Sequence, residues 1–174
     1  AWRALEEDMT PLMIGGDHSA AIGSIAAAAQ SVPGVGIVWI DAHGDLNTPE
    51  SSPPGNLWGM PLRVLLDHGV VAPGDVALIG ARSLDPPEVD YLAKMGIDDS
   101  LERAVARVDA VYVALDLDVL DPTEADMFMP EPNGPSVDEI DVVLRGTSAR
   151  TTIAGVGVTG FLLTDRNIPV ISRL

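Results

Sequence analysis

The chain has 174 residues, of which 47% are hydrophobic and 21% charged, a composition typical of a folded globular protein rather than a disordered one. Its 26 acidic residues against 10 basic ones give a formal charge of −16, and only 4% of residues are aromatic. These values argue against a nucleic-acid partner, because binding phosphates requires basic patches. The absence of cysteine excludes disulfides, thiolate metal ligands and cysteine nucleophiles.

The length predicts a single domain, 1–174, that buries about 70% of the surface its unfolded chain would expose. Residues 1–10 lack the basic and apolar regions of a signal peptide, and no apolar run approaches the roughly 18 residues needed to cross a membrane. We therefore expect a cytoplasmic protein without a membrane partner. Because the sequence lacks an initiator Met and enters directly on a helical stretch, we also expect that an upstream part is missing.

The chain alternates between short apolar runs and longer segments with helical spacing. We predict strands at residues 11–14, 35–40, 76–79, 111–117 and 153–158, and helices at 20–30, 61–68, 87–95, 101–108 and 137–145. Ser136 with Glu139 fits a capping box, and Asp85 before Pro86 fits an N-cap followed by proline in the first turn. Strands that are apolar on both faces and separated by helices predict an α/β fold with a central parallel sheet.

Three of the predicted strands are followed by unusually polar segments, at residues 15–19, 41–45 and 116–122. In such folds, ligands bind beyond the carboxyl ends of the strands. Alternate residues of an extended backbone point to one face, so Asp41, His43 and Asp45 can converge, as can Asp116 and Asp118. Carboxylates crowded together in this way repel one another, and proteins relieve that repulsion by protonation or by bound cations. The pattern predicts a metal site.

The proposed ligand set also restricts the metal. It comprises four carboxylates and two imidazoles: His18, Asp41, His43, Asp45, Asp116 and Asp118. These are too many ligands for one tetrahedral zinc, but they suit two adjacent ions that share bridging carboxylates. Oxygen ligands with some nitrogen and no sulfur favour Mn²⁺, while Zn²⁺, Fe²⁺, Co²⁺ and Ni²⁺ stay open. We expect two Mn²⁺ ions.

Taken singly, each polar segment has an ordinary explanation. Residues 15–18 could be a tight turn in which Asp17 caps a helix, 41–45 a hydrogen-bonded loop, and 116–122 an aspartate-rich turn before a proline. Their joint occurrence at three predicted strand ends is what favours metal. His68 precedes Gly69 at a predicted helix end, where a cation is favourable, so it needs no function.

Two other motifs compete with this interpretation. Residues 155–160 satisfy the dinucleotide pattern Gly-x-Gly-x-x-Gly, but Pro169 and the chain end stand where a Rossmann site needs a helix and an acidic residue. We expect these glycines to allow close packing instead. Residues 116–127 begin like an EF-hand loop, but Leu120, Asp121 and Met127 occupy positions where that loop needs a ligand, a glycine and a glutamate.

The three polar segments, Gly-Gly-Asp-His-Ser, Asp-Ala-His-Gly-Asp and Asp-Leu-Asp-Val-Leu-Asp-Pro, resemble the metal signatures of the ureohydrolases, that is, arginases, agmatinases and formimidoylglutamases. Residues 55–61 and 79–85 extend the resemblance. It implies a three-layer α/β/α fold, a binuclear manganese centre that hydrolyses guanidino or formimino groups, and a homo-oligomer, trimeric or hexameric. It also implies that the family's opening strand and helix are absent, that the join from Ile97 to Asp98 is short, and that a helix would follow Leu174.

The resemblance assigns roles to individual residues. Two divalent ions flanking a water lower its pKa and make a hydroxide that attacks the amidine carbon, with the ions about 3.5–4 Å apart. Asp45 is implied both to bind metal and to pass a proton to the leaving nitrogen. Asn47, Asn56 and Asp85 match positions that bind the amino-acid end of the substrate in arginases. Ser19 is interpreted as a loop hydroxyl.

The chain also departs from the family pattern. Trp58 stands where arginases have a histidine thought to shuttle protons, Gly160 where a glutamate binds the guanidinium, and Pro54 where a substrate-binding serine is expected. An indole cannot shuttle protons, and losing the glutamate leaves a buried cation without its partner. A substrate other than arginine is therefore expected. The alternative to a hydrolase is a non-catalytic, metal-stabilised relative of the ureohydrolases that binds a small molecule or assembles with a partner.

Overall fold

The computed structural model describes residues 9–52 and 55–174, which form five parallel strands in the order β1-β5-β4-β2-β3. The strands are β1 (Leu12–Ile14), β2 (Gly36–Ile40), β3 (Val76–Ile79), β4 (Ala110–Asp116) and β5 (Thr152–Thr159). Each strand lies at a predicted position, and none of its bounds differs from the predicted bound by more than one residue. The predicted parallel sheet is confirmed.

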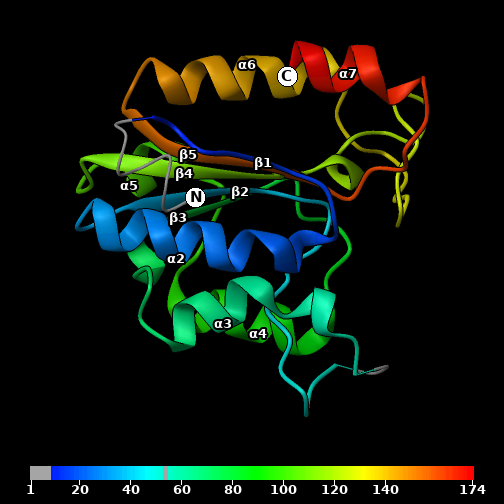
Figure 1. Ribbon diagram of the computed structural model, residues 1–174. Helices are drawn as coiled ribbons and strands as arrows, with labels where there is room; N and C mark the ends of the chain where they lie inside the picture. The colour runs from blue at the N-terminus through cyan, green and yellow to red at the C-terminus, as the bar shows by residue number, and fades with distance from the viewer. Residues whose placement is uncertain (1–8, 53–54) are drawn as a thin grey trace.

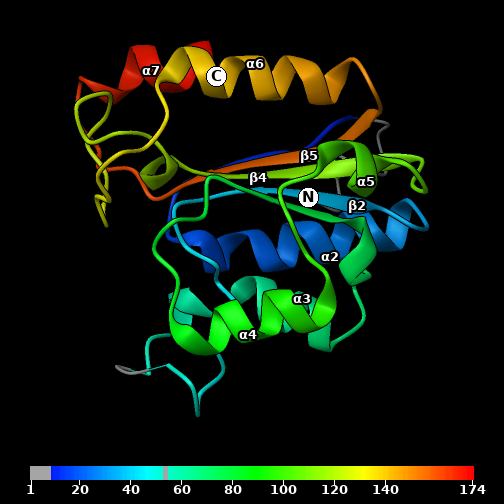
Figure 2. The ribbon, with the colours of Figure 1, turned by 180° about the vertical axis from the view of Figure 1, so that it is seen from behind.

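Helices cover both faces of this sheet, so the molecule has three layers (Figures 1 and 2). One face carries α2 (Ala21–Ser31), α3 (Pro61–Asp67) and α4 (Pro86–Met95). The other carries α5 (Leu101–Val105), α6 (Val137–Ser148) and α7 (Asn167–Arg173). The three-layer α/β/α architecture is confirmed.

Alternation along the central strands explains why both faces are covered. In β2, Ile37 and Trp39 pack into the core beneath α2 and α3, whereas Val38 and Ile40 pack into the core beneath α6. All five residues of this strand are buried. Since successive side chains of a strand point to opposite faces, a continuous apolar run requires a helical layer on each side.

Two of the predicted helices differ from the observed ones by three residues at one end, the other three by a single residue at one or both ends, and one helix is new. The helix expected at 101–108 ends at Val105, and the helix expected at 137–145 continues to Ser148. The prediction that Pro169 stands in the way of a helix is wrong, because α7 contains this proline. Pro169 is the third residue of α7, and N–H groups in a first turn have no partner within the helix, so proline is tolerated there.

The glycines of β5 allow close packing, as expected. A Cβ added to Gly155 would lie 2.6 Å from the ring of Tyr112, whose hydroxyl donates a hydrogen bond to Ser24 Oγ at 2.8 Å. Gly157 borders the same ring, with its added Cβ 3.1 Å from the Tyr112 hydroxyl. The sequence pattern that resembles a dinucleotide motif therefore serves the packing of the sheet against α2.

Replacing Gly155 with alanine is expected to destabilise the fold by about 1–3 kcal/mol, because the added methyl overpacks a buried ring. Urea unfolding followed by circular dichroism would measure the change. Gly23→Ala is the control, since Gly23 lies inside α2 with open space around it and alanine is expected to stabilise by about 0.5–1 kcal/mol. Equal stability of Gly155→Ala and the parent would contradict this account.

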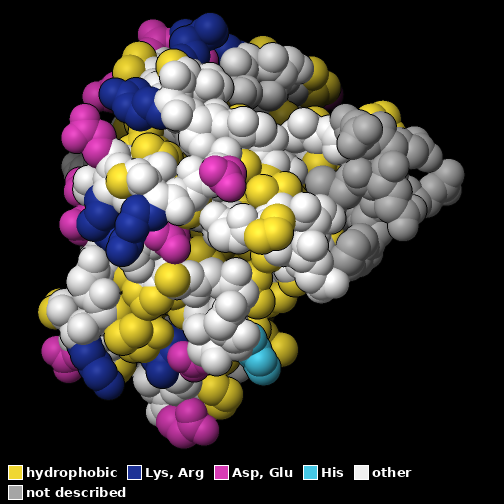
Figure 3. Space-filling model, turned by 90° about the vertical axis from the view of Figure 1, so that its left-hand side faces the viewer, with side chains coloured by type: hydrophobic (Ala, Val, Ile, Leu, Met, Phe, Trp, Pro, Cys, Tyr) yellow, Lys and Arg dark blue, Asp and Glu magenta, His cyan; other side chains and the backbone are white. Residues whose placement is uncertain are grey.

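The strands all run in one direction, so their carboxyl ends meet at the right-hand side of Figure 1. The loops that follow β1, β2 and β4 gather there. At the opposite end, which faces the viewer in Figure 3, Lys and Arg side chains lie among Asp and Glu side chains. The polarity of the strands therefore directs all three polar segments to one edge of the sheet.

Candidate metal centre

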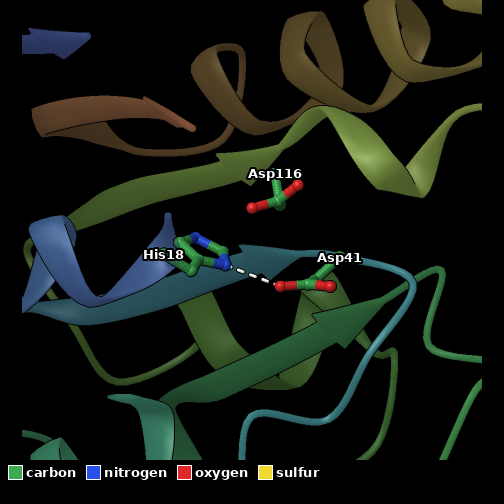
Figure 4. A group of neighbouring side chains, drawn as sticks. All are labelled: His18, Asp41 and Asp116. Carbon is green, nitrogen blue, oxygen red and sulfur yellow. Dashed lines mark hydrogen bonds and ion pairs between the residues drawn. The ribbon is translucent and has the colours of Figure 1, made fainter. Parts of the chain in front are cut away.

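Among the described residues, two groups of side chains at the carboxyl edge of the sheet could each hold a metal ion. The first is His18, Asp41 and Asp116 (Figure 4), and the second is Asp41, His43 and Asp118. Within each group the ligand atoms all lie within 4.8 Å of one another. Asp41 belongs to both groups, so its two oxygens can serve two neighbouring ions.

The strand order explains how residues distant in sequence meet here. Asp41 directly follows β2 and Asp116 ends β4, the strand hydrogen-bonded to β2. Asp118 lies in the short 3₁₀ turn Leu117–Val119 that follows β4, and His18 begins the turn His18–Ala20 that follows β1. Asp17 caps that turn by accepting the Ser19 N–H, in agreement with the ordinary explanation of residues 15–18, and also accepts the Ser19 hydroxyl.

Hydrogen bonds fix the orientation of the carboxylates. Asp41 Oδ1 accepts the backbone N–H of His43 at 2.7 Å, and Asp118 Oδ1 accepts that of Ala42 at 3.1 Å. Asp116 accepts the Asp118 N–H at 3.0 Å and the Thr159 hydroxyl at 3.0 Å. Each acid thus keeps one oxygen or lone pair free for a ligand while its position is set by the backbone.

The two histidines point their Nδ1 atoms at these acids. His18 Nδ1 lies 2.6 Å from Asp41 Oδ2, and His43 Nδ1 lies 3.0 Å from Asp118 Oδ2. Burial disfavours their protonation, but the hydrogen bonds to Asp41 and its neighbours outweigh it and raise the pKa of His18 to about 10 and that of His43 to about 11. The same bonds overcome burial at Asp41 and hold its pKa well below the usual range.

The remaining acids show the opposite behaviour. Burial raises the pKa of Asp118 to about 8, with repulsion from Asp41 adding to the effect. Burial and repulsion from Asp41 also raise the pKa values of Asp116 and Asp45. Without a cation, burial and repulsion therefore favour the protonated form of these crowded acids, and a bound divalent ion would relieve the same repulsion.

Asp45 lies beside the first group rather than within it. Its Oδ2 is 3.4 Å from His18 Nδ1, and its backbone has φ of 53°, a left-handed conformation that costs energy in a non-glycine residue. Within the described residues, Asp45 Oδ2 and His18 Nε2 are buried without a hydrogen-bond partner. Buried polar atoms normally have partners, so the free Asp45 oxygen fits a missing ligand such as a cation.

The predicted substrate residues line the same cavity as the candidate ligands, together with Trp58 and Gly160. This cavity has a volume of about 280 Å³ and includes Asn47, Asn56 and Asp85. Asn47 Nδ2 donates to Asp85 Oδ2 at 2.9 Å, so two of these residues are already paired. Pro54 lies outside the described residues. The structure thus brings together nine site residues predicted from sequence, although His18 and Asp118 are 100 positions apart.

Sequence reasoning missed several residues that build the site. Glu88 is buried and accepts the N–H groups of Leu46 and Asp85, each at 2.9 Å, which ties the loop after β2 to the start of α4. The spacing Asp85-x-x-Glu88 is a capping-box pattern and could have identified Glu88.

Thr159 and Arg82 also support the site, but no local sequence pattern indicates either of them. The Arg82 guanidinium donates to the carbonyl oxygens of Gly80, Asp118, Val119, Leu120, Glu131 and Pro132.

The fold and this cluster together define an α/β protein with residues that could hold a metal cluster at the carboxyl edge of a parallel sheet. Comparison with known proteins identifies the group more closely. A model described as the Arginase family matches residues 1–160. The chain belongs to the arginase family, and the predicted relationship to the ureohydrolases is confirmed.

Individual relatives agree with this assignment. The arginase of Staphylococcus aureus strain MRSA252 is 39% identical over 149 residues, covering 70% of this chain and 49% of that protein. The arginase of Bacillus subtilis strain 168 is 40% identical over 152 residues, covering 71% and 51%. The crystal structure of arginase from Bacillus cereus has a TM-score of 0.88 at 33% identity, covering 97% of this chain and 69% of that one.

The chain spans about half the length of the curated relatives it matches. A formimidoylglutamase from Bacillus subtilis has a TM-score of 0.83 at 23% identity, covering 94% of this chain and 57% of that one, which shows a shared fold. The helices in the described ranges 9–52 and 55–174 were also compared with the length and hydropathy that a membrane span requires. None of them meets both requirements.

Proposed function

We propose that this chain forms the metal-binding core of a hydrolase that uses two Mn²⁺ ions to cleave a C–N bond in a guanidino or formimino compound. The observation that carries the proposal is the pair of candidate metal groups that share Asp41. Membership of the arginase family supports the class of reaction. The oxygen-rich ligand set, with two imidazoles and no sulfur, favours manganese.

Six side chains would hold the ions. His18, Asp41 and Asp116, with Asp45 beside them, face one position, while Asp41, His43 and Asp118 face the other. When bound, two divalent ions lower the pKa of water between them and so supply a nucleophile at neutral pH.

Asp45 is the side chain proposed to carry a proton to the leaving nitrogen. It lines the cavity, and within the described residues its Oδ2 has no hydrogen-bond partner. Two hydrogen bonds fix the backbone around Asp45: Arg63 N–H donates to the Asp45 carbonyl at 3.0 Å, and Leu46 N–H donates to the Glu88 carboxylate. Positioning within reach of the substrate is the first requirement of a general acid.

Asn47, Asn56 and Asp85 are proposed to contact the substrate at some distance from the metal positions. All three line the cavity. Gly160 lines it too, but offers no carboxylate to pair with a substrate cation. The small-molecule substrate is therefore proposed to differ from arginine.

The test is release of urea or ammonia from a panel of guanidino and formimino compounds by the Mn²⁺-loaded full-length protein. We expect turnover of at least one compound, with two metal ions per chain by elemental analysis and a loss of activity after chelation. A fully metallated protein that turns over no compound would instead favour a non-catalytic, small-molecule-binding relative. A cytoplasmic location and a trimeric or hexameric assembly stay predictions, which fractionation and light scattering would check.

A further inference from the structure

One wall of the cavity is apolar and exposed. Trp58, Phe128 and Met129 line it and have relative exposures of 37%, 54% and 37%. The Trp58 and Phe128 rings meet edge to face, with centroids 6.0 Å apart and planes at 85°. Large apolar side chains left exposed on the wall of a cavity indicate a surface that binds an apolar group.

The two segments that carry these rings are held in place by backbone hydrogen bonds. Phe128 N–H donates to the Gly160 carbonyl at 2.7 Å, and Leu162 N–H donates to the Asp126 carbonyl at 3.0 Å. Trp58 lies in the 3₁₀ turn Leu57–Gly59, and the Gly59 carbonyl accepts the Asn47 N–H at 3.0 Å. A surface fixed before binding loses little conformational entropy when a ligand arrives, so this wall is suited to recognition.

The cavity also contains a carboxylate without a hydrogen bond. Asp85 is paired with Asn47, and Glu88 with two backbone N–H groups. The Glu131 carboxylate, by contrast, accepts no hydrogen bond within the described part of the chain, and its one ion pair there is with His43, at 3.6 Å between Oε1 and Nε2. Its backbone is nevertheless fixed, because the Glu131 carbonyl accepts from Arg82 at 2.8 Å. Because its side chain is 30% exposed and lines the cavity, Glu131 can also pair with a cationic group of a ligand.

We propose that the cavity selects compounds in which a guanidinium or amidinium head is joined to an apolar, preferably aromatic, tail. The head lies beside Glu131, and the tail packs against Trp58 and Phe128. This inference rests on the proposed function for the chemistry of the head group. An α-amino-acid tail fits less well, because its charges would lose water against the two rings and Met129.

Calorimetric titration of the Mn²⁺-loaded full-length protein tests the proposal with three kinds of probe: methylguanidine, arginine, and phenylalkylguanidines of increasing chain length. We expect the best phenylalkylguanidine to bind at least about tenfold more tightly than methylguanidine or arginine, since burial of a phenyl ring is worth that much or more. Trp58 fluorescence should change on binding of the phenyl compounds, whereas Trp39 is fully buried and should report little.

Substitutions separate the head from the tail. Trp58→Ala and Phe128→Leu should weaken binding of phenylalkylguanidines about fivefold or more but leave methylguanidine within about twofold. Glu131→Gln should weaken all the guanidinium probes by a similar factor. Val142→Ala is the control, because Val142 is an exposed apolar side chain on α6. Circular dichroism and metal content would be measured for each variant.

The outcomes distinguish this inference from the proposed function. If the predicted order of affinities appears but no compound is hydrolysed, the proposed hydrolase activity fails and the selectivity of the cavity stands. If guanidino compounds are hydrolysed but the phenyl series has no advantage, or if Trp58→Ala weakens all probes equally, the proposed tail site is wrong. If the Glu131→Gln variant binds all probes as tightly as the parent does, the proposed pairing of the guanidinium head with Glu131 is wrong.

Discussion

Asp118→Asn is expected to remove one of two metal ions and to reduce any hydrolytic activity by at least about a hundredfold. Asparagine can still accept the Ala42 N–H that Asp118 Oδ1 accepts at 3.1 Å, so the loop after β2 should keep its structure. What it loses is the negative charge that an ionised Asp118 would offer to a metal ion beside His43, whose Nδ1 lies 3.0 Å from Asp118 Oδ2. Elemental analysis after dialysis would count the metal ions, and the panel assay would measure turnover.

The metal-free variant should be at least as stable as the metal-free parent. Burial and repulsion from Asp41 raise the pKa of Asp118 from 3.8 to about 8, so the folded state holds its proton more tightly than the unfolded state. Stability contributed by that proton is present below about pH 4 and is lost as pH rises toward about 8. Asparagine does not titrate, so the variant should lose less stability across this range.

Asp90→Asn serves as the control for Asp118→Asn, because it removes the same charge from an exposed position on α4. It should leave metal content and activity as in the parent. Retention of two metal ions per chain by Asp118→Asn would contradict the assignment of Asp118 as a ligand, whatever its effect on turnover.

Gly160→Ala is expected to destabilise the protein by about 2–4 kcal/mol and to abolish metal binding at the first group. Gly160 has φ of +71°, and an added Cβ would lie 1.7 Å from Asp116 Oδ1. Asp116 would have to move away from the Thr159 hydroxyl and from the position where it faces His18 and Asp41. Urea unfolding and calorimetric Mn²⁺ titration would measure the two effects.

Gly96→Ala separates conformational strain from this steric conflict. Gly96 has φ of +67° at the end of α4, but an added Cβ meets nothing within 4 Å. This variant should lose only about 1–2 kcal/mol and bind Mn²⁺ normally. If the two variants behaved alike and both bound Mn²⁺ as the parent does, the contact between position 160 and Asp116 would have no consequence for the site.

The same contact bears on the departure from the ureohydrolase pattern that the sequence predicts at position 160. A glutamate at position 160 would need a Cβ in space that Asp116 occupies, so this backbone accommodates glycine alone without rearrangement. A guanidinium bound here must therefore find its carboxylate elsewhere in the cavity. Glu131 meets that need in the proposed selectivity, from a loop whose sequence gave no signal of the role.

The local pattern of residues by itself determined the five strands, most helices and the types of side chain at the site. Strand β2 shows why: its apolar residues and the acids that follow it are contiguous, so composition and spacing reveal both. Motif spacing also placed His18, Asp41 and Asp116 at strand ends. It missed α7, because a proline that interrupts a helix and one that begins a helix look alike until the first turn is located.

Tertiary structure alone decided which atoms meet. The strand order places the ends of β1, β5, β4 and β2 side by side, and only this order makes Asp41 common to both metal groups. It also brings Thr159 to Asp116, Arg82 to the carbonyl of Glu131, and Trp58 to Phe128. These contacts join residues that are 43, 49 and 70 positions apart in the sequence. Hydrophobic periodicity carries no information over such separations, because it reports only how neighbouring side chains divide between buried and exposed faces.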